Sequence, residues 1–103
     1  MLLIREIMYC KPGKVRPMVE KALAMSKMSE KAGMGKMRVM TDLSAERFWT
    51  IVMELEAPSL QEFEDMMSGK GQKEEDMKQM EKIMKDYHEY VDHGRREIYK
   101  VEQ

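Results

Sequence analysis

The sequence is poor in cysteine and has no excess of charge of either sign. Its 103 residues contain one cysteine, Cys10, which has no partner for an internal disulfide, so we expect a reducing compartment and, by default, the cytoplasm. The 18 basic and 19 acidic residues nearly cancel, which removes the electrostatic basis for binding nucleic acid or an anionic membrane. No apolar run is long enough to span a bilayer. We therefore predict neither nucleic acid nor a membrane as a partner.

The chain is long enough for one domain and too short for two. Hydrophobic residues make up 43% of it and charged residues 36%, which is the composition of a globular rather than a disordered chain. A domain of this size buries only about two-thirds of the surface of its unfolded chain. We predict a single domain over residues 1–103, for which a core shared with a second copy would add stability.

Two periods of apolar residues divide the chain into strands and helices. A spacing of two is typical of a strand, and spacings of three and four are typical of an amphipathic helix. Glycine and proline mark the turns between these elements. The sequence predicts strands over residues 2–9, 36–42, 47–56 and 95–101, a helix from Lys14 to Gly33, a helical region from Ser59 that breaks at residues 68–71, and a last helix through Met77, Met84 and Val91 that stops at Gly94.

This order of elements favours a ferredoxin-like α+β fold, β-α-β-β-α-β, in which the helices cover one face of a four-stranded antiparallel sheet. In strand 47–56 the odd positions, from Trp49 to Leu55, are predicted to face the helices. The even positions include Phe48 and Val52, so the second face is apolar too. An antiparallel sheet with one face in water alternates more cleanly between apolar and polar residues.

Something is therefore expected to cover the second face of the sheet. In a chain this short, a second copy of the same sheet is the simplest cover, which predicts a homodimer through the sheet faces and a dimeric α/β barrel. The alternative is a monomer with a few exposed apolar residues.

Two charged side chains, Arg5 and Glu54, stand within otherwise apolar strands. We predict a structural ion pair between them, and contact with a polar ligand is the alternative. Trp49 is predicted to anchor the core, and the alternative is that it forms a wall of a ligand pocket.

The two histidines lie near the end of the last predicted helix. His88 borders the apolar stripe and is the candidate base of a pocket between helix and sheet; a packed or solvated side chain is the alternative. His93 is predicted at the helix end, where the dipole favours a cation. Glu89 with His93, and His88 with Asp92, supply only two ligands each, so no metal site is predicted. Among the 14 methionines, the closely spaced Met25, Met28, Met34, Met37 and Met40 are predicted to fill the core rather than bind copper, and no cofactor is expected.

Three segments resemble known proteins. Residues 5–14 (REIMYCKPGK) resemble the first strand and turn of the NIPSNAP-like proteins. Residues 57–64 (APSLQEFE) look like the start of the second helix in the dimeric α/β barrel superfamily, and residues 94–101 (GRREIYKV) resemble its final strand. The resemblance implies a dimeric α/β barrel, in a superfamily that includes cofactor-independent monooxygenases of antibiotic biosynthesis. Some of those enzymes use an asparagine, a tryptophan and a histidine, and this sequence supplies Trp49 and two histidines but no asparagine.

Two functional hypotheses follow. The first is a homodimer that binds a small apolar or aromatic molecule between sheet and helices, or that has a structural role. The second is a cofactor-independent, monooxygenase-like oxidoreductase acting on an aromatic or quinol-like substrate, with His88 and Trp49 in contact with it. The candidate ligand-binding residues are Trp49, His88, Arg5 and Glu54, and His88 is the candidate catalytic residue. A pocket that holds His88, Arg5 or Glu54 would support an enzyme, whereas a His88 that points to solvent would argue against it.

Overall fold

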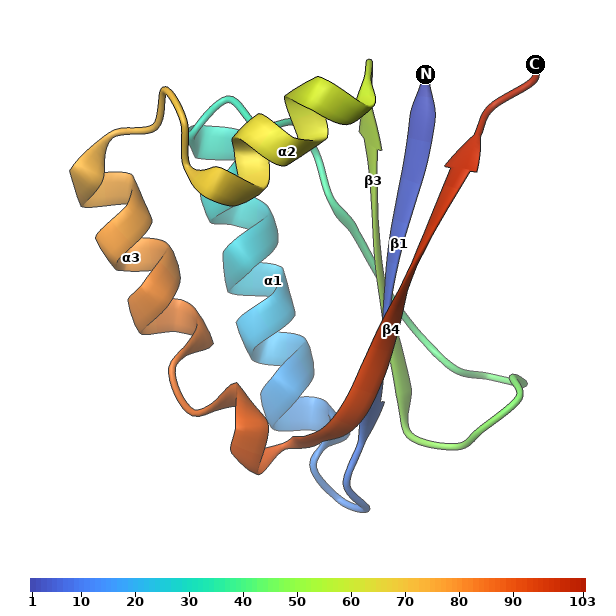
Figure 1. Cartoon of the computed structure of the whole chain (residues 1–103). Helices are drawn as coiled ribbons and strands as arrows, with labels where there is room; N and C mark the ends of the chain where they lie inside the picture. The colour runs from blue at the N-terminus through green and yellow to red at the C-terminus, as the bar shows by residue number, and fades with distance from the viewer.

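A four-stranded antiparallel sheet with all its helices on one side makes up the protein, as the computed structural model of residues 1–103 shows (Figure 1). The strand order is β2-β3-β1-β4, which together with the order along the chain confirms the ferredoxin-like α+β fold. The elements are β1 (Leu2–Cys10), α1 (Val15–Lys31), β2 (Arg38–Thr41), β3 (Thr50–Ala57), α2 (Leu60–Ser68), α3 (Glu74–Met84), the 3-10 turn η1 (Tyr87–Glu89) and β4 (Val91–Lys100).

The core lies between the sheet and the helices. The period-two alternation of β3 turns Ile51 and Met53 toward α1, as predicted, and both are buried against Met18 and Ala22. A second, smaller cluster at the other end of the sheet contains Phe63 of α2. Three methionines are buried: Met18, Met28 and Met53. Of the five predicted to fill the core, Met28 is buried and Met37 packs against the main core cluster, whereas Met40 lies on the opposite face of the sheet.

The helices do not cover the whole of this face. Helix α3 lies beside α1, on the side away from the sheet, and none of its residues is buried (Figure 1). The edge strand β4 is consequently left with exposed side chains on the helix side, Ile98 among them. No helix combines the length and the apolar character needed to cross a bilayer.

The predicted last helix is wrong at its C-terminal end. Helix α3 stops at Met84, Lys85 leaves the helical conformation and Asp86 has a left-handed backbone, so that Val91 begins β4 instead of ending a helix. Pairing with the central strand β1 decides this, because Val91 lies opposite Cys10.

Gly94, predicted to stop a helix, lies inside β4 opposite Met8. A Cβ atom there would stand 2.7 Å from the carbonyl oxygen of Ile7. The glycine is needed because β4 and β1 approach each other closely at this point.

The third predicted strand is wrong at its N-terminal end. It begins at Thr50 rather than at residue 47, because Trp49 has a positive φ of 63° and cannot continue an extended chain. Residues 42–49 instead form a loop between β2 and β3, hereafter the β2–β3 loop, which projects from the face of the sheet away from the helices (Figure 1). We call this face the open face.

Candidate functional site

The open face carries a row of alternating charges across all four strands. Arg38, Glu54, Arg5 and Glu97 occupy directly opposed positions on β2, β3, β1 and β4. The Arg5 guanidinium lies 3.0 Å from Glu54, and its Nε donates to the same carboxylate at 3.1 Å. Glu97 lies 3.9 Å from Arg5, and Arg38 lies 3.9 Å from Glu54. The predicted ion pair is present, and it is the centre of this longer charge row.

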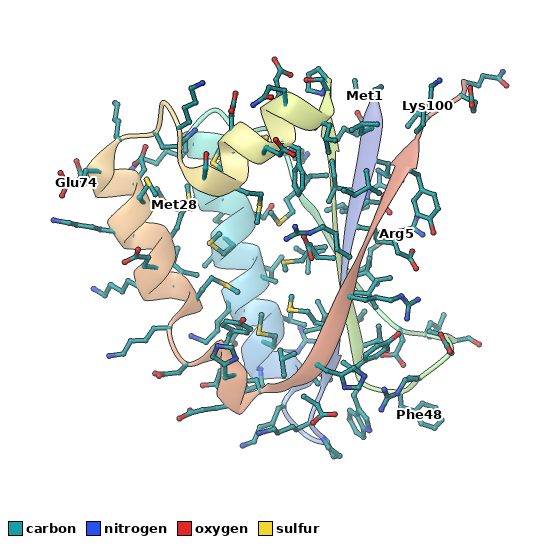
Figure 2. All side chains as sticks on the ribbon, viewed as in Figure 1. Met1, Arg5, Met28, Phe48, Glu74 and Lys100 are labelled. Atoms are coloured by element: carbon teal, nitrogen blue, oxygen red, sulfur yellow. The ribbon has the colours of Figure 1, made fainter.

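A cavity of about 330 Å³ lies beside the charge row, beneath the β2–β3 loop. Its floor is the next row of the sheet, where Arg95, Ile7, Val52 and Met40 oppose one another. Figure 2 shows Arg5 on the open face and Phe48 on the projecting loop. The cavity therefore combines an apolar floor with a charged edge.

A cluster around Tyr9 ties the loop to the sheet. The Tyr9 ring is buried, with the Arg47 guanidinium 4.6 Å from its centroid and the His93 ring 4.9 Å away. Arg95 donates to the Tyr9 hydroxyl and lies 3.8 Å from Glu46 of the loop. The prediction that His93 ends a helix is wrong, because β4 places it opposite Tyr9.

A second cleft, of about 420 Å³, lies on the helix side of the sheet, where α3 leaves β4 uncovered. His88 lines this cleft, as does Tyr87, whose ring centroid is 4.0 Å from that of His88. Glu6 and Arg96 form an ion pair in the same cleft. His88 itself is exposed, which agrees with the solvated alternative stated for it.

Trp49 does not anchor the core, and that prediction is wrong. Its side chain is 45% exposed, and it lines a shallow pocket with Val15 and Phe48 rather than the cleft of His88. The predicted shared contact of Trp49 and His88 with one ligand is therefore not formed in the single chain. The four candidate residues lie in three separate places. Arg5 and Glu54 are together on the open face, His88 lines the helix-side cleft, and Trp49 lines the shallow pocket.

The titratable groups of the two faces differ in their surroundings. Hydrogen bonds from the Tyr99 hydroxyl and from Arg95 hold the pKa of Glu97 below its usual range. Burial, and then the charge of Asp42, raise the pKa of the Cys10 thiol. Cys10 therefore stays a neutral thiol near pH 7 and lacks the thiolate character of a nucleophile.

The histidine, cysteine and acidic side chains form no group of three or more that could hold a metal ion. Sequence reasoning missed Tyr9, Arg47, Arg95 and Glu97 as parts of the open-face site. Arg95 and Glu97 could have been found, because they alternate on a predicted strand as Arg5 and Ile7 do.

Comparisons with known proteins agree with this class of fold, the ferredoxin-like α+β sheet. No protein-family model and no curated protein sequence matches the chain. A NIPSNAP domain protein from Burkholderia xenovorans is similar in structure, with a TM-score of 0.70 and 13% identity over 98% of this chain and 94% of that one.

Two further solved structures have the same fold. A NIPSNAP-like domain protein from the same organism reaches a TM-score of 0.75 with 8% identity over 97% of this chain and 84% of its own. An antibiotic biosynthesis monooxygenase-like protein from Deinococcus radiodurans has a TM-score of 0.70 with 10% identity, over 100% and 94% of the two chains. At such identities the likeness shows the shared fold, and the resemblance to NIPSNAP-like structures is confirmed at that level.

Proposed function

We propose that the protein is a homodimer that binds a small apolar or aromatic molecule between sheet and helices. The observation that carries the binding function is the helix-side cleft, whose volume of about 420 Å³ falls within the range of small-molecule sites. It lies where the last helix leaves the edge strand uncovered, so no segment of the chain fills it.

The lining of the cleft defines the class of ligand. Met8, Tyr87 and Val91 supply apolar and aromatic surface, and they also pack against the main core cluster, which keeps them in place. His88 and the Glu6–Arg96 pair supply the polar groups. An aromatic ring with one hydroxyl or carbonyl substituent matches this lining, because the ring meets the apolar side chains and the substituent meets a donor.

Binding is tested with anilinonaphthalene sulfonate, an aromatic probe whose fluorescence rises in apolar clefts. We expect saturable binding of one probe per chain. His88→Trp should fill the cleft and weaken binding by about tenfold or more, and the side chain it replaces is exposed, so the fold should tolerate it. Glu89→Trp, at the neighbouring exposed position outside the cleft, is the matched control and should bind as the unmodified chain does. Equal affinities for the two variants would contradict the site.

The dimer is supported by the open face. Its central row carries Ile7, Val52 and Met40, and its charged residues are paired within the face. A second sheet can therefore cover it without leaving a buried charge unpaired, which is the main cost of such burial. Two copies would pair by a twofold axis through the same surface.

Pairing is tested by sedimentation equilibrium on Val52→Lys. A lysine at the centre of the open face should convert the dimer to a chain of 12.2 kDa. The control is Lys82→Glu on α3, which changes charge on an exposed helix and should leave the mass doubled. If both variants keep the mass of the unmodified protein, the open face is not the interface.

An oxidoreductase acting on an aromatic or quinol-like substrate is the second candidate, because His88 lines the same cleft and an imidazole nitrogen can accept a proton from a bound hydroxyl group. Oxygen uptake with a naphthoquinol tests it. An enzyme should consume oxygen above the uncatalysed rate and lose that rate in His88→Gln. If the protein binds the probe but does not take up oxygen, the binding function is supported and the oxidoreductase hypothesis is refuted.

A further inference from the structure

We infer that two copies pair about a twofold axis parallel to the strands, so that the charge row of one copy faces the same row of the other in reversed order. This inference rests on the proposed homodimer. It adds the orientation of the two sheets and the contacts between chains that fix that orientation.

The signs of the charge row alternate in register across the whole sheet. Arg38, Glu54, Arg5 and Glu97 follow one another on β2, β3, β1 and β4. The row therefore begins with a cation at one edge of the sheet and ends with an anion at the other, so that reversing its order puts an anion opposite every cation. A surface with this property is complementary to its own copy, as a twofold interface requires.

A twofold axis parallel to the strands, midway between β3 and β1, reverses the strand order of the second copy. Arg5 then faces Glu54 of the second copy, and Arg38 faces Glu97 of the second copy. Each charge keeps its neighbours within the chain, such as Arg5 and Glu54 at 3.0 Å, and gains an opposite charge across the interface. The mean strand directions of the two sheets are aligned in this arrangement, which is one of the two usual ways in which sheets pack.

The row beside the charges fits the same axis. It carries Arg95, Ile7, Val52 and Met40 on β4, β1, β3 and β2. In reversed order, Ile7 faces Val52 of the second copy, so apolar side chains meet at the centre of the interface. Arg95 faces Met40 of the second copy, which the aliphatic stem of the arginine can cover.

A twofold axis across the strands loses this complementarity. If the axis runs along the charge row, each strand lies on its own copy, so Glu54 would face Glu54 and Arg5 would face Arg5, and like charges across an interface oppose association. The same axis would place Val52 against Glu56 of the second copy. If the axis runs between the two rows, the charges lie on apolar side chains, where they lose water without gaining a partner.

Charge reversal at the two ends of the row tests the orientation. Arg38→Glu would face Glu97 of the second copy, and Glu97→Arg would face Arg38, so each variant alone should dimerise at least about tenfold more weakly than the unmodified chain. An equal mixture of the two variants should dimerise within about threefold of the unmodified chain, because opposite charges then meet at both ends of the row. Sedimentation equilibrium measures the dissociation constants, and circular dichroism verifies that each variant is folded.

The control pair is Lys82→Glu and Glu81→Arg, which make the same changes of charge sign at exposed positions of α3. Each should dimerise as the unmodified chain does, alone and in the mixture. This pair has the same net charges as the test pair, so a recovery confined to the test pair comes from the charge row.

Cross-linking tests the same contact without reversing a charge. Chains with Arg38→Cys and chains with Glu97→Cys are mixed and treated with a short bismaleimide, while the native Cys10 is buried and should not react. We expect a link in the mixture and none in either variant alone, because the axis brings β2 of one copy to β4 of the other and keeps the two copies of β2 apart.

Three results would overturn the inference. Links within a single variant, no link in the mixture, or charge-reversed variants that dimerise as tightly as the unmodified chain would refute this orientation and leave the proposed dimer in place. An unmodified chain that stays monomeric over the whole concentration range would refute the dimer itself, and the orientation with it.

Discussion

The two faces of the sheet use the same strands in opposite ways. On β3, Ile51 is fully buried against α1, whereas its neighbour Val52 stays half-buried on the open face. The helix face is completed by side chains of its own chain, except at the cleft beside β4. The open face is organised by polar contacts. The charge row crosses its four strands, and the Tyr9 cluster lies beside the β2–β3 loop. The first face is closed by the chain's own helices, whereas the second carries paired charges beside half-buried apolar side chains, which is why we propose that a second copy covers it.

The largest expected effect on the free energy of unfolding comes from comparing two neighbouring residues of β3, Ile51 on the helix face and Val52 on the open face. Ile51→Ala should lower the free energy of unfolding by about 3 kcal/mol, because it leaves a cavity in the closed core. In the dissociated single chain, Val52→Ala should cost about 1 kcal/mol or less, since the site is half-buried there and no second copy covers it. Urea denaturation at one fixed protein concentration, below the dimer dissociation constant, measures both. Equal losses would mean that the open face is as closed as the helix face.

Gly94→Ala tests the close approach of β4 to β1, which positions Arg95 on the open face and Arg96 on the helix face. We expect a loss of about 2 kcal/mol, because the added Cβ would meet the Ile7 carbonyl oxygen at 2.7 Å and force the strands apart. Lys100→Ala, at an exposed position of the same strand, should change the stability by less than about 0.5 kcal/mol. A neutral Gly94→Ala would show that the strands can separate freely.

Glu54→Gln tests the charge row. Glu54 has arginine partners on both sides and is largely covered, so we expect a loss of about 1 kcal/mol. Glu74→Gln removes an exposed pair with Lys78 at 3.3 Å on α3 and should cost less than about 0.5 kcal/mol. If the two substitutions lower the free energy of unfolding equally, the charge row stabilises the protein no more than an exposed ion pair does.

The smallest expected effect is the contribution of Glu97 to the pH dependence of folding stability. Its folded pKa is depressed by the Tyr99 and Arg95 hydrogen bonds, so its contribution is complete above the unfolded value of about 4.3 and is lost as the pH falls below it. The unmodified chain should therefore lose more stability than Glu97→Gln between pH 7 and the acid range. Tyr99→Phe removes the hydrogen bond that lowers the pKa of Glu97 most, so this variant should lose less stability in acid than the unmodified chain. Identical acid profiles for all three chains would contradict this assignment.

The sequence predicted the helix face well and the open face only in part. Alternation along one strand is enough to turn Ile51 and Met53 inward, because that pattern is local. The charge row depends on the register of four strands, which no local pattern contains, so the sequence predicts the Arg5–Glu54 pair but not its continuation to Arg38 and Glu97.

The misplaced end of the last helix has a similar cause. Tyr87 and Val91 continue the apolar spacing of α3, and they do pack against the core, but from a 3-10 turn and a strand. Pairing with β1 outweighs the local helical pattern there. Trp49 continues the odd positions of β3, and this pattern predicts a place in the core. The left-handed backbone conformation that turns it away has no sequence signal such as glycine or asparagine.

Small-angle X-ray scattering at micromolar concentration tests most directly the claim that the open face is covered by a second copy. We expect a particle of twice 12.2 kDa with a radius of gyration clearly above the 13.8 Å of one chain. A particle of 12.2 kDa with a radius near 13.8 Å across the concentration series would contradict it.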